Sequence, residues 1–398
     1  MTHPSSPAGS VVGGMLLIAG SCIGAGMLAL PILTGLAGFF PAVCILAVAW
    51  AFMTFTGLLL VEVNGWFKGQ VNLVSMAADA LGEKGRLIAW FSYLFLFYSL
   101  LVAYTVVSGS IFSAILASVL GWTVSPSVAS IFFTLFFGVI IYLGTRPVDL
   151  LNRLLMIGLI TAYLGMIGCG LFKIHPDYLL HAAPASMLLA LPTLVVSFGF
   201  QNMIPSLVAY LGGDFRRMRL TILGGGGIIF VIYVVWIMLV LGVVEYPAIL
   251  ESYEQGAEAT GALRSALGSS AVSHFAQGFA FFAIVTSFLA QGMTLTHFLA
   301  DGFGTKPNRK NLLWFCSLAF LPPLVFALYY PNMFFKALNL AGGVFAMILF
   351  GILPVLMVWV GRYRRKHATP YRVFGGKTAL LIALGCSLFV IICELMRK

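Results

Sequence analysis

The chain has 398 residues, of which 61% are hydrophobic and only 9% are charged. Soluble globular domains carry about 25% charged residues, so this composition excludes an ordinary soluble protein. Repeated apolar runs of about 20 residues or more instead predict an all-α polytopic membrane protein in a lipid bilayer. The net charge of +10 resides in short segments between these runs, where it indicates membrane topology rather than nucleic-acid binding.

We predict eleven transmembrane helices in one transporter-like domain, residues 1–398. Their approximate limits are 11–37, 40–66, 87–119, 126–145, 151–172, 186–211, 218–245, 272–300, 311–330, 334–360 and 377–396. The first run has no basic n-region and no cleavage site, so we expect it to be retained. Most of the 22 lysines and arginines lie in one alternate set of connecting segments. The positive-inside rule therefore predicts a cytoplasmic N-terminus and a C-terminus outside.

The first span contains a stretch that interrupts regular helix. Gly20, Gly24 and Gly26 fall within seven residues, and Pro31 follows them. In lipid each unpaired backbone group costs several kcal/mol, so a broken helix requires a function. Half-helix ends and free N–H groups can form a site for a charged substrate. The alternative is that small residues allow another helix to pack closely.

A second break is predicted in the sixth span. Ser197-Phe198-Gly199-Phe200-Gln201-Asn202 is followed by Pro205 inside an apolar run. Five spans separate the starts of the two broken helices, so the second unit is expected to be inverted relative to the first. This pattern predicts a first repeat over 11–172, a second over 186–360, and an additional helix over 377–396.

Two connecting segments and the cysteines complete the chain. The segment 246–271 predicts one or two short surface helices, and 71–81 predicts either an interfacial helix or a solvated connector. The six cysteines show no CxxC pairing, so neither a disulfide framework, a metal site nor a cofactor is expected. Catalytic arrangements such as paired carboxylates are also missing, which argues against an enzyme. A selectivity filter repeated around an axis is not evident, which argues against a channel.

Several of these motifs together resemble a known family. Ile23-Gly24-Ala25-Gly26-Met27-Leu28-Ala29-Leu30-Pro31, Glu62, Ala103-Tyr104, Ser197–Phe200 and Thr286-Ser287-Phe288-Leu289 are similar to the bacterial aromatic amino acid permeases, within the amino acid–polyamine–organocation superfamily. The resemblance covers about residues 10–394. It implies a five-plus-five inverted repeat of the leucine-transporter-like type in the bacterial inner membrane. It also implies import of tyrosine, with tryptophan as a second candidate, driven by a proton gradient.

An amino acid substrate brings a carboxylate and an ammonium group that cannot stay unpaired in low dielectric. We expect the N–H groups of Gly24, Ala25 and Gly26 to bind the carboxylate at a positive half-helix end. The carbonyls near Ser21, Cys22 and Ile23, and those near Ser197 and Phe198, are expected to bind the ammonium.

The aromatic part of the substrate needs a flat apolar slot. Phe198 and Phe200 are the expected walls, Gly199 leaves room for the ring, and Tyr104 is expected to lie under the ring or bind the carboxylate. Gln201 and Asn202 either face a polar cavity or cap the broken backbone. A transporter of the same fold for a small hydroxy amino acid remains the alternative, and it predicts a filled pocket at Gly199.

Three residues are candidates for the coupling ion. Glu62 lies inside the second span, where it either carries a proton or binds the broken backbone; alternatively it extends to the interface beside Lys68. Thr286 and Ser287 either coordinate sodium together with carbonyls of the first span or bind their own i−4 carbonyls. Residues 154–172 contain no charged side chain. This excludes the lysine by which some proton-coupled relatives replace sodium, and leaves a proton on Glu62, sodium or uncoupled exchange.

Overall fold

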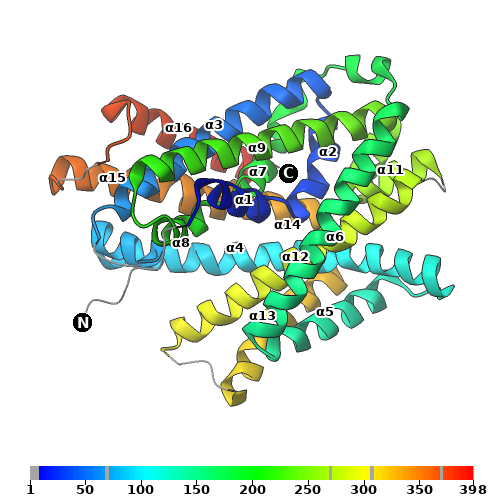
Figure 1. Cartoon of the computed structure of the whole chain (residues 1–398), viewed down its shortest axis with the longest axis horizontal. Helices are drawn as coiled ribbons and strands as arrows, with labels where there is room; N and C mark the ends of the chain where they lie inside the picture. The colour runs from blue at the N-terminus through cyan, green and yellow to red at the C-terminus, as the bar shows by residue number, and fades with distance from the viewer. Residues whose placement is uncertain (1–8, 68–70, 269–270, 305–308, 368–370, 398) are drawn as a thin grey trace.

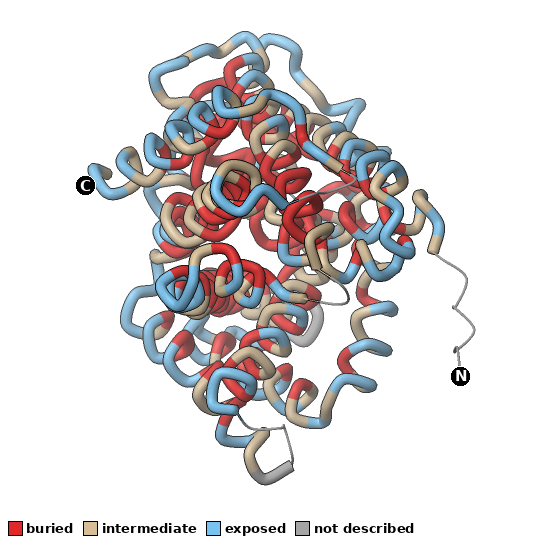
Figure 2. The backbone as a smooth tube through the Cα atoms, turned by 90° about the vertical axis from the view of Figure 1, so that its left-hand side faces the viewer, coloured by how far each residue is buried: buried red, intermediate tan, exposed pale blue. Residues whose placement is uncertain are grey.

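The computed structural model describes residues 9–67, 71–268, 271–304, 309–367 and 371–397. Within these ranges every regular element is a helix. Nine of the described helices are long and apolar enough to cross a membrane, or ten if the bent pair at the N-terminus is one span. The helices form an elongated bundle (Figure 1), with buried residues inside and exposed residues on the outer faces (Figure 2).

The elements of the first half are α1 (Val11–Cys22), α2 (Ala25–Gly35), α3 (Phe39–Asn64), α4 (Leu73–Leu120), α5 (Pro126–Tyr142) and α6 (Thr145–Gly170), followed by the short 3-10 turns η1 (Leu171–Lys173), η2 (Pro176–Leu180) and η3 (Pro184–Ala190). The second half begins with α7 (Leu191–Ser197), η4 (Gln201–Met203), α8 (Ile204–Tyr210), α9 (Phe215–Val243), α10 (Tyr246–Gln255), α11 (Ala259–Leu267) and α12 (Ala271–Gly302). It ends with α13 (Arg309–Tyr329), α14 (Phe334–Leu340), the π-helix η5 (Ala341–Ile352), α15 (Leu353–Trp359), the π-helix η6 (Val360–Arg364) and α16 (Gly376–Met396).

Both predicted helix breaks are present. The axes of α1 and α2 differ by 65°, and the bend falls at Ile23 and Gly24, which separate the two helices. In the sixth predicted span, α7 ends at Ser197 and the chain passes through η4 before α8 begins at Ile204. Pro31 lies inside α2 rather than at its end.

The two uncertain segments are helical. In α4 the backbone leaves helical geometry at Gly82, with φ 73° and ψ −163°, so the residues from Leu73 to Leu81 form a separate helical segment before a kink. Glycine suits this position because a positive φ is strained for other residues. The segment predicted as an interfacial helix or a solvated connector is thus helical over Leu73–Leu81, and its position at the membrane interface stays a prediction. The segment 246–271 contains two short helices, α10 and α11, as predicted.

Prolines inside two spans leave backbone carbonyls without their usual helical donor. A proline has no N–H, so the carbonyl four residues earlier is left unpaired. The carbonyl of Met27, four residues before Pro31, accepts a hydrogen bond from the indole Nε1 of Trp236 at 2.8 Å. The carbonyl of Leu318, four residues before Pro322, accepts one from the Tyr98 hydroxyl at 2.8 Å. Aromatic donors from neighbouring helices thus allow these prolines in an apolar environment.

The two ends of the bundle can be told apart by their contacts. At the N-terminal end, the amide of Gly9 donates to the carbonyl of Tyr210, and the ring of Phe215 stacks on that of Tyr371 with centroids 5.8 Å apart. The opposite end, called here the far end, contains α10, α11 and the start of α5. In Figure 1 the N-terminal end is on the left, near α8 and α15, and α11 lies on the right.

Candidate functional site

A cavity of about 500 Å³ lies between the two helix breaks. Ligand pockets are typically about 300–1,000 Å³, so its size suits a small organic molecule. The residues of the first break that line it are Ser21, Cys22, Ile23, Gly24, Ala25 and Gly26, and those of the second are Ser197, Gly199 and Asn202. No Asp, Glu, Lys, Arg or His lines this cavity in the described part of the chain. Backbone groups and neutral side chains must therefore supply its polarity.

Glycines allow the broken segments to approach each other and α12. A Cβ atom added at Gly26 would lie 2.8 Å from Oγ of Ser197, and one added at Gly24 would collide with Oγ of Ser287. Real Cβ contacts are longer, so a side chain at either position would force the neighbouring serine hydroxyl to move. Gly24 and Gly26 therefore allow close packing, which was the alternative explanation for these glycines, and they also line the cavity.

The ends of the half-helices carry opposite partial charges. The last residues of α1 and α7, Cys22 and Ser197, present carbonyl groups at the negative ends. The positive end of α2 begins at Ala25, whose N–H donates to Oγ of Ser287 at 3.2 Å. A ligand with one negative and one positive group finds complementary ends within a single cavity.

The aromatic walls differ from those expected from the sequence. Phe97, Tyr104 and Phe350 line the cavity, and Gly199 opens toward the ring of Phe350. Phe198 and Phe200 do not line it, and each is only 1% exposed.

Each of these two phenylalanines packs against a neighbouring helix instead. The ring of Phe198 lies edge-on to that of Tyr233, with centroids 5.2 Å apart. The ring of Phe200 packs against Gly57 of α3. They are the chain neighbours of Gly199, which lines the cavity, but their own side chains point away from the cavity.

The two amides of the second break have different surroundings. Nε2 of Gln201 donates to the carbonyl of Met53 at 3.0 Å and lies 3.3 Å from Oγ1 of Thr56, so this side chain attaches the break to α3. Asn202 lines the central cavity and also a neighbouring one of about 530 Å³ toward the N-terminal end. The two cavities share Phe97, Asn202 and Thr294. The central cavity therefore adjoins another cavity on the side of the N-terminal end.

Two further amides on the cavity wall were not identified from the sequence. Oδ1 of Asn152 on α6 and Oε1 of Gln291 on α12 are buried and have no hydrogen-bond partner among the described residues. An amide inside an apolar span is itself a signal of a polar environment, so both could have been found. They are candidate acceptors for a hydroxyl or N–H group of a ligand.

Thr286 and Ser287, the two candidates for ion binding on α12, have hydroxyl groups with different hydrogen-bond partners. Oγ1 of Thr286 donates to the carbonyl of Phe282 at 2.8 Å, its own i−4 carbonyl. Oγ of Ser287 instead accepts from the N–H of Ala25 across the cavity. Both residues line the cavity.

Glu62 has an ionic partner that the sequence did not suggest. Its side chain is fully buried, and Oε1 accepts from Nε of Arg362 at 2.6 Å. Oε2 accepts from Nη2 of Arg362 and from the N–H of Val373, the latter at 2.7 Å. Arg362 lies in the π-helical extension of the tenth predicted span, so this ion pair joins α3 to η6. Lys68, the partner considered from the sequence, lies outside the described residues.

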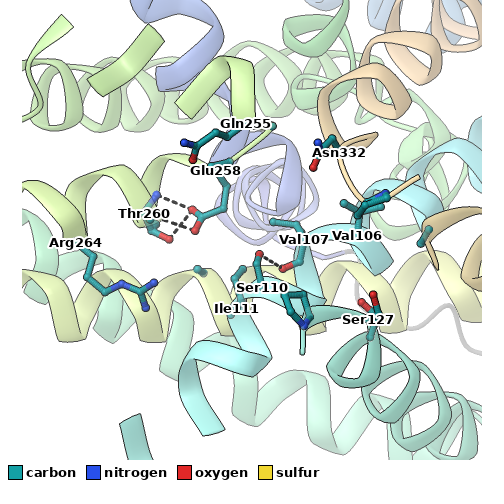
Figure 3. A pocket seen from close by; sticks show the side chains of 18 of the residues that line it. Val106, Val107, Ser110, Ile111, Ser127, Gln255, Glu258, Thr260, Arg264 and Asn332 are labelled. Carbon is teal, nitrogen blue, oxygen red and sulfur yellow. Dashed lines mark hydrogen bonds between the residues drawn. The ribbon is translucent and has the colours of Figure 1, made fainter. Parts of the chain in front are cut away.

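A third cavity, of about 320 Å³, lies at the far end, between α4, α5, α11 and α12 (Figure 3). Glu258 lies beside it and caps α11, accepting from the N–H of Thr260 at 2.6 Å and from that of Gly261 at 2.9 Å. Burial raises the pKa of this carboxyl, and its hydrogen bonds with Thr260 act in the opposite direction. The far cavity shares no lining residue with the central one.

Comparison with known proteins points to one group of transporters. The model of the tryptophan/tyrosine permease family matches residues 8–394. Tyrosine-specific transport systems 1 and 2 of Haemophilus influenzae are 34% and 36% identical to the chain over 384 and 381 residues, which cover 94% of this chain and 93% of each relative. The tryptophan-specific transport protein of Shigella flexneri is 29% identical over 392 residues, covering 96% and 94%.

Proposed function

The chain belongs to the tryptophan/tyrosine permease family, and from this premise we propose that it imports aromatic amino acids, L-tyrosine first and L-tryptophan second. The observation that carries the proposal is the central cavity. It combines the ends of two broken helices, which suit a zwitterion, with Phe97, Tyr104 and Phe350, which suit an aromatic ring. We therefore propose that the cavity binds a substrate that is transported and is not chemically changed.

The finer architecture that we propose is eleven spans, arranged as a five-plus-five inverted repeat of the leucine-transporter-like type with an additional helix. Two observations support it. The apolar helix α5 has 17 residues and is proposed as the eleventh span beside the ten others, and α1–α2 and α7–α8 are each interrupted by a break. The proposed location is the bacterial inner membrane, with the N-terminus in the cytoplasm and the C-terminus outside.

In this proposed orientation the cavity that adjoins the central one lies on its cytoplasmic side. The neighbouring cavity toward the N-terminal end shares Phe97, Asn202 and Thr294 with the central cavity. The far cavity is separate from it. This arrangement supports a state from which substrate is released inward in an alternating-access cycle.

A proton is the proposed coupling ion, and Glu62 is its candidate carrier. Protonation would remove the negative charge that faces Arg362 and would weaken the buried ion pair. Because this pair joins α3 to η6, its weakening would alter the packing of these two helices. Sodium at Ser287 and Thr286 is the competing proposal, since Ser287 faces the first break.

Uptake of labelled tyrosine into proteoliposomes tests the proposal. Proton and sodium gradients are applied separately, with tryptophan, phenylalanine and serine as competitors. Proton-driven accumulation that tryptophan blocks and serine does not is the expected result. A sodium requirement would move the ion site to Ser287 and Thr286. Serine transport without tyrosine uptake under either gradient would overturn the aromatic assignment.

A further inference from the structure

Tyr233 joins the two helix breaks from behind the cavity. Its side chain, on α9, is completely buried. The hydroxyl oxygen lies 2.7 Å from the carbonyl oxygen of Cys22 and 2.7 Å from that of Ser197. In Figure 1, α1, α7 and α9 lie together at the centre of the bundle.

Both carbonyls belong to helix ends. Cys22 is the last residue of α1 and Ser197 the last of α7, so neither carbonyl has a donor four residues later in its own helix. A tyrosine hydroxyl carries one hydrogen and can donate to only one of the two at a time. Among the described residues, the two carbonyls therefore share the single hydroxyl hydrogen of Tyr233.

The contacts of Tyr233 also limit the distance between the carbonyl oxygens of the two breaks. Two oxygens that each lie 2.7 Å from the same atom cannot be more than about 5.4 Å apart. An ammonium nitrogen forms hydrogen bonds of about 2.7–2.9 Å to oxygen, so it can bridge a pair with this spacing. Cys22 and Ser197 both line the cavity, whereas Tyr233 does not. Each carbonyl oxygen has two lone pairs, so it can accept from the tyrosine on one side and from a ligand on the other.

From this geometry we propose that Tyr233 is a positioning residue for the ammonium group of the substrate. Its hydroxyl holds the carbonyls of Cys22 and Ser197 at the spacing that one ammonium can bridge. The cavity wall carries no carboxylate among the described residues, so these two carbonyls are the main partners of the positive charge. The inference rests on the proposed transport of amino acids and assigns the recognition of their amino group.

The test separates recognition of the ammonium from recognition of the rest of the molecule. Binding is measured on the purified protein for tyrosine and for 3-(4-hydroxyphenyl)propionate, which is tyrosine without its amino group. We expect Tyr233→Phe to weaken tyrosine binding by about tenfold or more, since the two carbonyls lose the hydroxyl that positions them for the ammonium, while binding of the analogue changes by less than about twofold. The phenylalanine ring keeps the packing against Phe198.

Tyr163→Phe is the matched control. Its hydroxyl, on α6, donates to the carbonyl of Ile232 at 3.0 Å, next to Tyr233 in the chain but away from both breaks. This variant is expected to leave both affinities unchanged. Tyr233→Met, which fills the space without a donor, is a second variant expected to reproduce the loss should Tyr233→Phe not fold.

Three results are decisive. An equal weakening of tyrosine and analogue, or no weakening of tyrosine in the Tyr233 variants, would overturn the role of Tyr233. A wild-type protein that binds neither compound would overturn the proposed function itself.

Discussion

The carboxylate of Glu62 and the guanidinium of Arg362 form a buried, two-pronged ion pair between residues 300 positions apart in the chain. Their side chains are 0% and 3% exposed. A buried pair of this kind contributes little net stability compared with an apolar pair, but removing one member leaves an uncompensated charge.

Breaking this pair from one side should therefore destabilise the protein strongly. Glu62→Gln or Arg362→Gln is expected to cost about 3–5 kcal/mol, and the double variant should recover part of that loss. The exposed pair of Asp149 and Arg153 is the control, and Asp149→Asn should cost about 0–1 kcal/mol. Melting temperatures of the purified variants measure both effects. Equal losses for Glu62→Gln and Asp149→Asn would contradict the buried pair.

The role of Glu62 in coupling needs a separate readout. If it carries the proton, Glu62→Gln should abolish accumulation driven by a proton gradient yet retain exchange of labelled for unlabelled tyrosine. Both are measured on protein reconstituted at equal amounts. Accumulation at the wild-type level would exclude Glu62 as the carrier.

The cavity at Gly199 should tolerate little additional volume. A Cβ atom there would lie 2.9 Å from the carbonyl oxygen of Val196 and 3.6 Å from the ring of Phe350. We expect Gly199→Val to raise the KM for tyrosine by about tenfold or more through overpacking of the aromatic slot. Gly227→Ala on α9, where a Cβ meets nothing within 4 Å, is the control. An unchanged KM in Gly199→Val would favour a small substrate.

The hydrogen bond between Trp236 and Met27 can be tested with a double-mutant cycle. Trp236→Phe leaves the Met27 carbonyl buried without a donor, at a cost of about 1–3 kcal/mol. Pro31→Ala restores an N–H four residues after Met27, so the same Trp236→Phe change should cost less in that background. Thermal stability of the four proteins gives the coupling. If the two changes prove additive, the indole does not replace the missing proline donor.

Glu258 should make stability depend on pH at the far end. Burial raises the pKa of this carboxyl above its usual value of about 4.5. Its contribution to stability is therefore complete below that value and is lost as the pH rises through the raised pKa. Between pH 4.5 and 8, the melting temperature of the wild type should fall more, or rise less, than that of Glu258→Gln.

The exposed Glu254 on α10 provides the control for this titration. Glu254→Gln should keep the wild-type dependence of melting temperature on pH. A Glu258→Gln variant that also keeps it would show that another group is responsible.

Local signals in the sequence were sufficient to locate both helix breaks and the two short helices at the far end. Glycines and prolines act on the backbone at their own positions, so their effect can be predicted without knowing the tertiary structure. The same holds for the apolar length of the spans, and α9 and α12 lie close to their predicted limits.

Partners from distant helices could not be predicted in this way. Tyr233, Trp236 and Arg362 have no local pattern that distinguishes them from the other aromatic and basic residues of the chain. Arg362 was assigned to a connecting segment, because a π-helical extension such as η6 has no clear sequence signature. The choice of Phe198 and Phe200 as walls followed from their position beside Gly199. Which way a side chain points at an irregular backbone depends on dihedral angles that the sequence alone does not provide.

The bond from Trp236 to Met27 also has a consequence for biosynthesis. The two residues are 209 positions apart, so α2 enters the bilayer long before α9 has been synthesised. During this interval the Met27 carbonyl faces Pro31 and has no donor in its own helix, a costly state in hydrocarbon. The first span can thus reach its final depth and tilt only when the seventh arrives. Insertion of the N-terminal half alone should yield a helix that stays near the translocon or the lipid headgroups, where water supplies the missing donor.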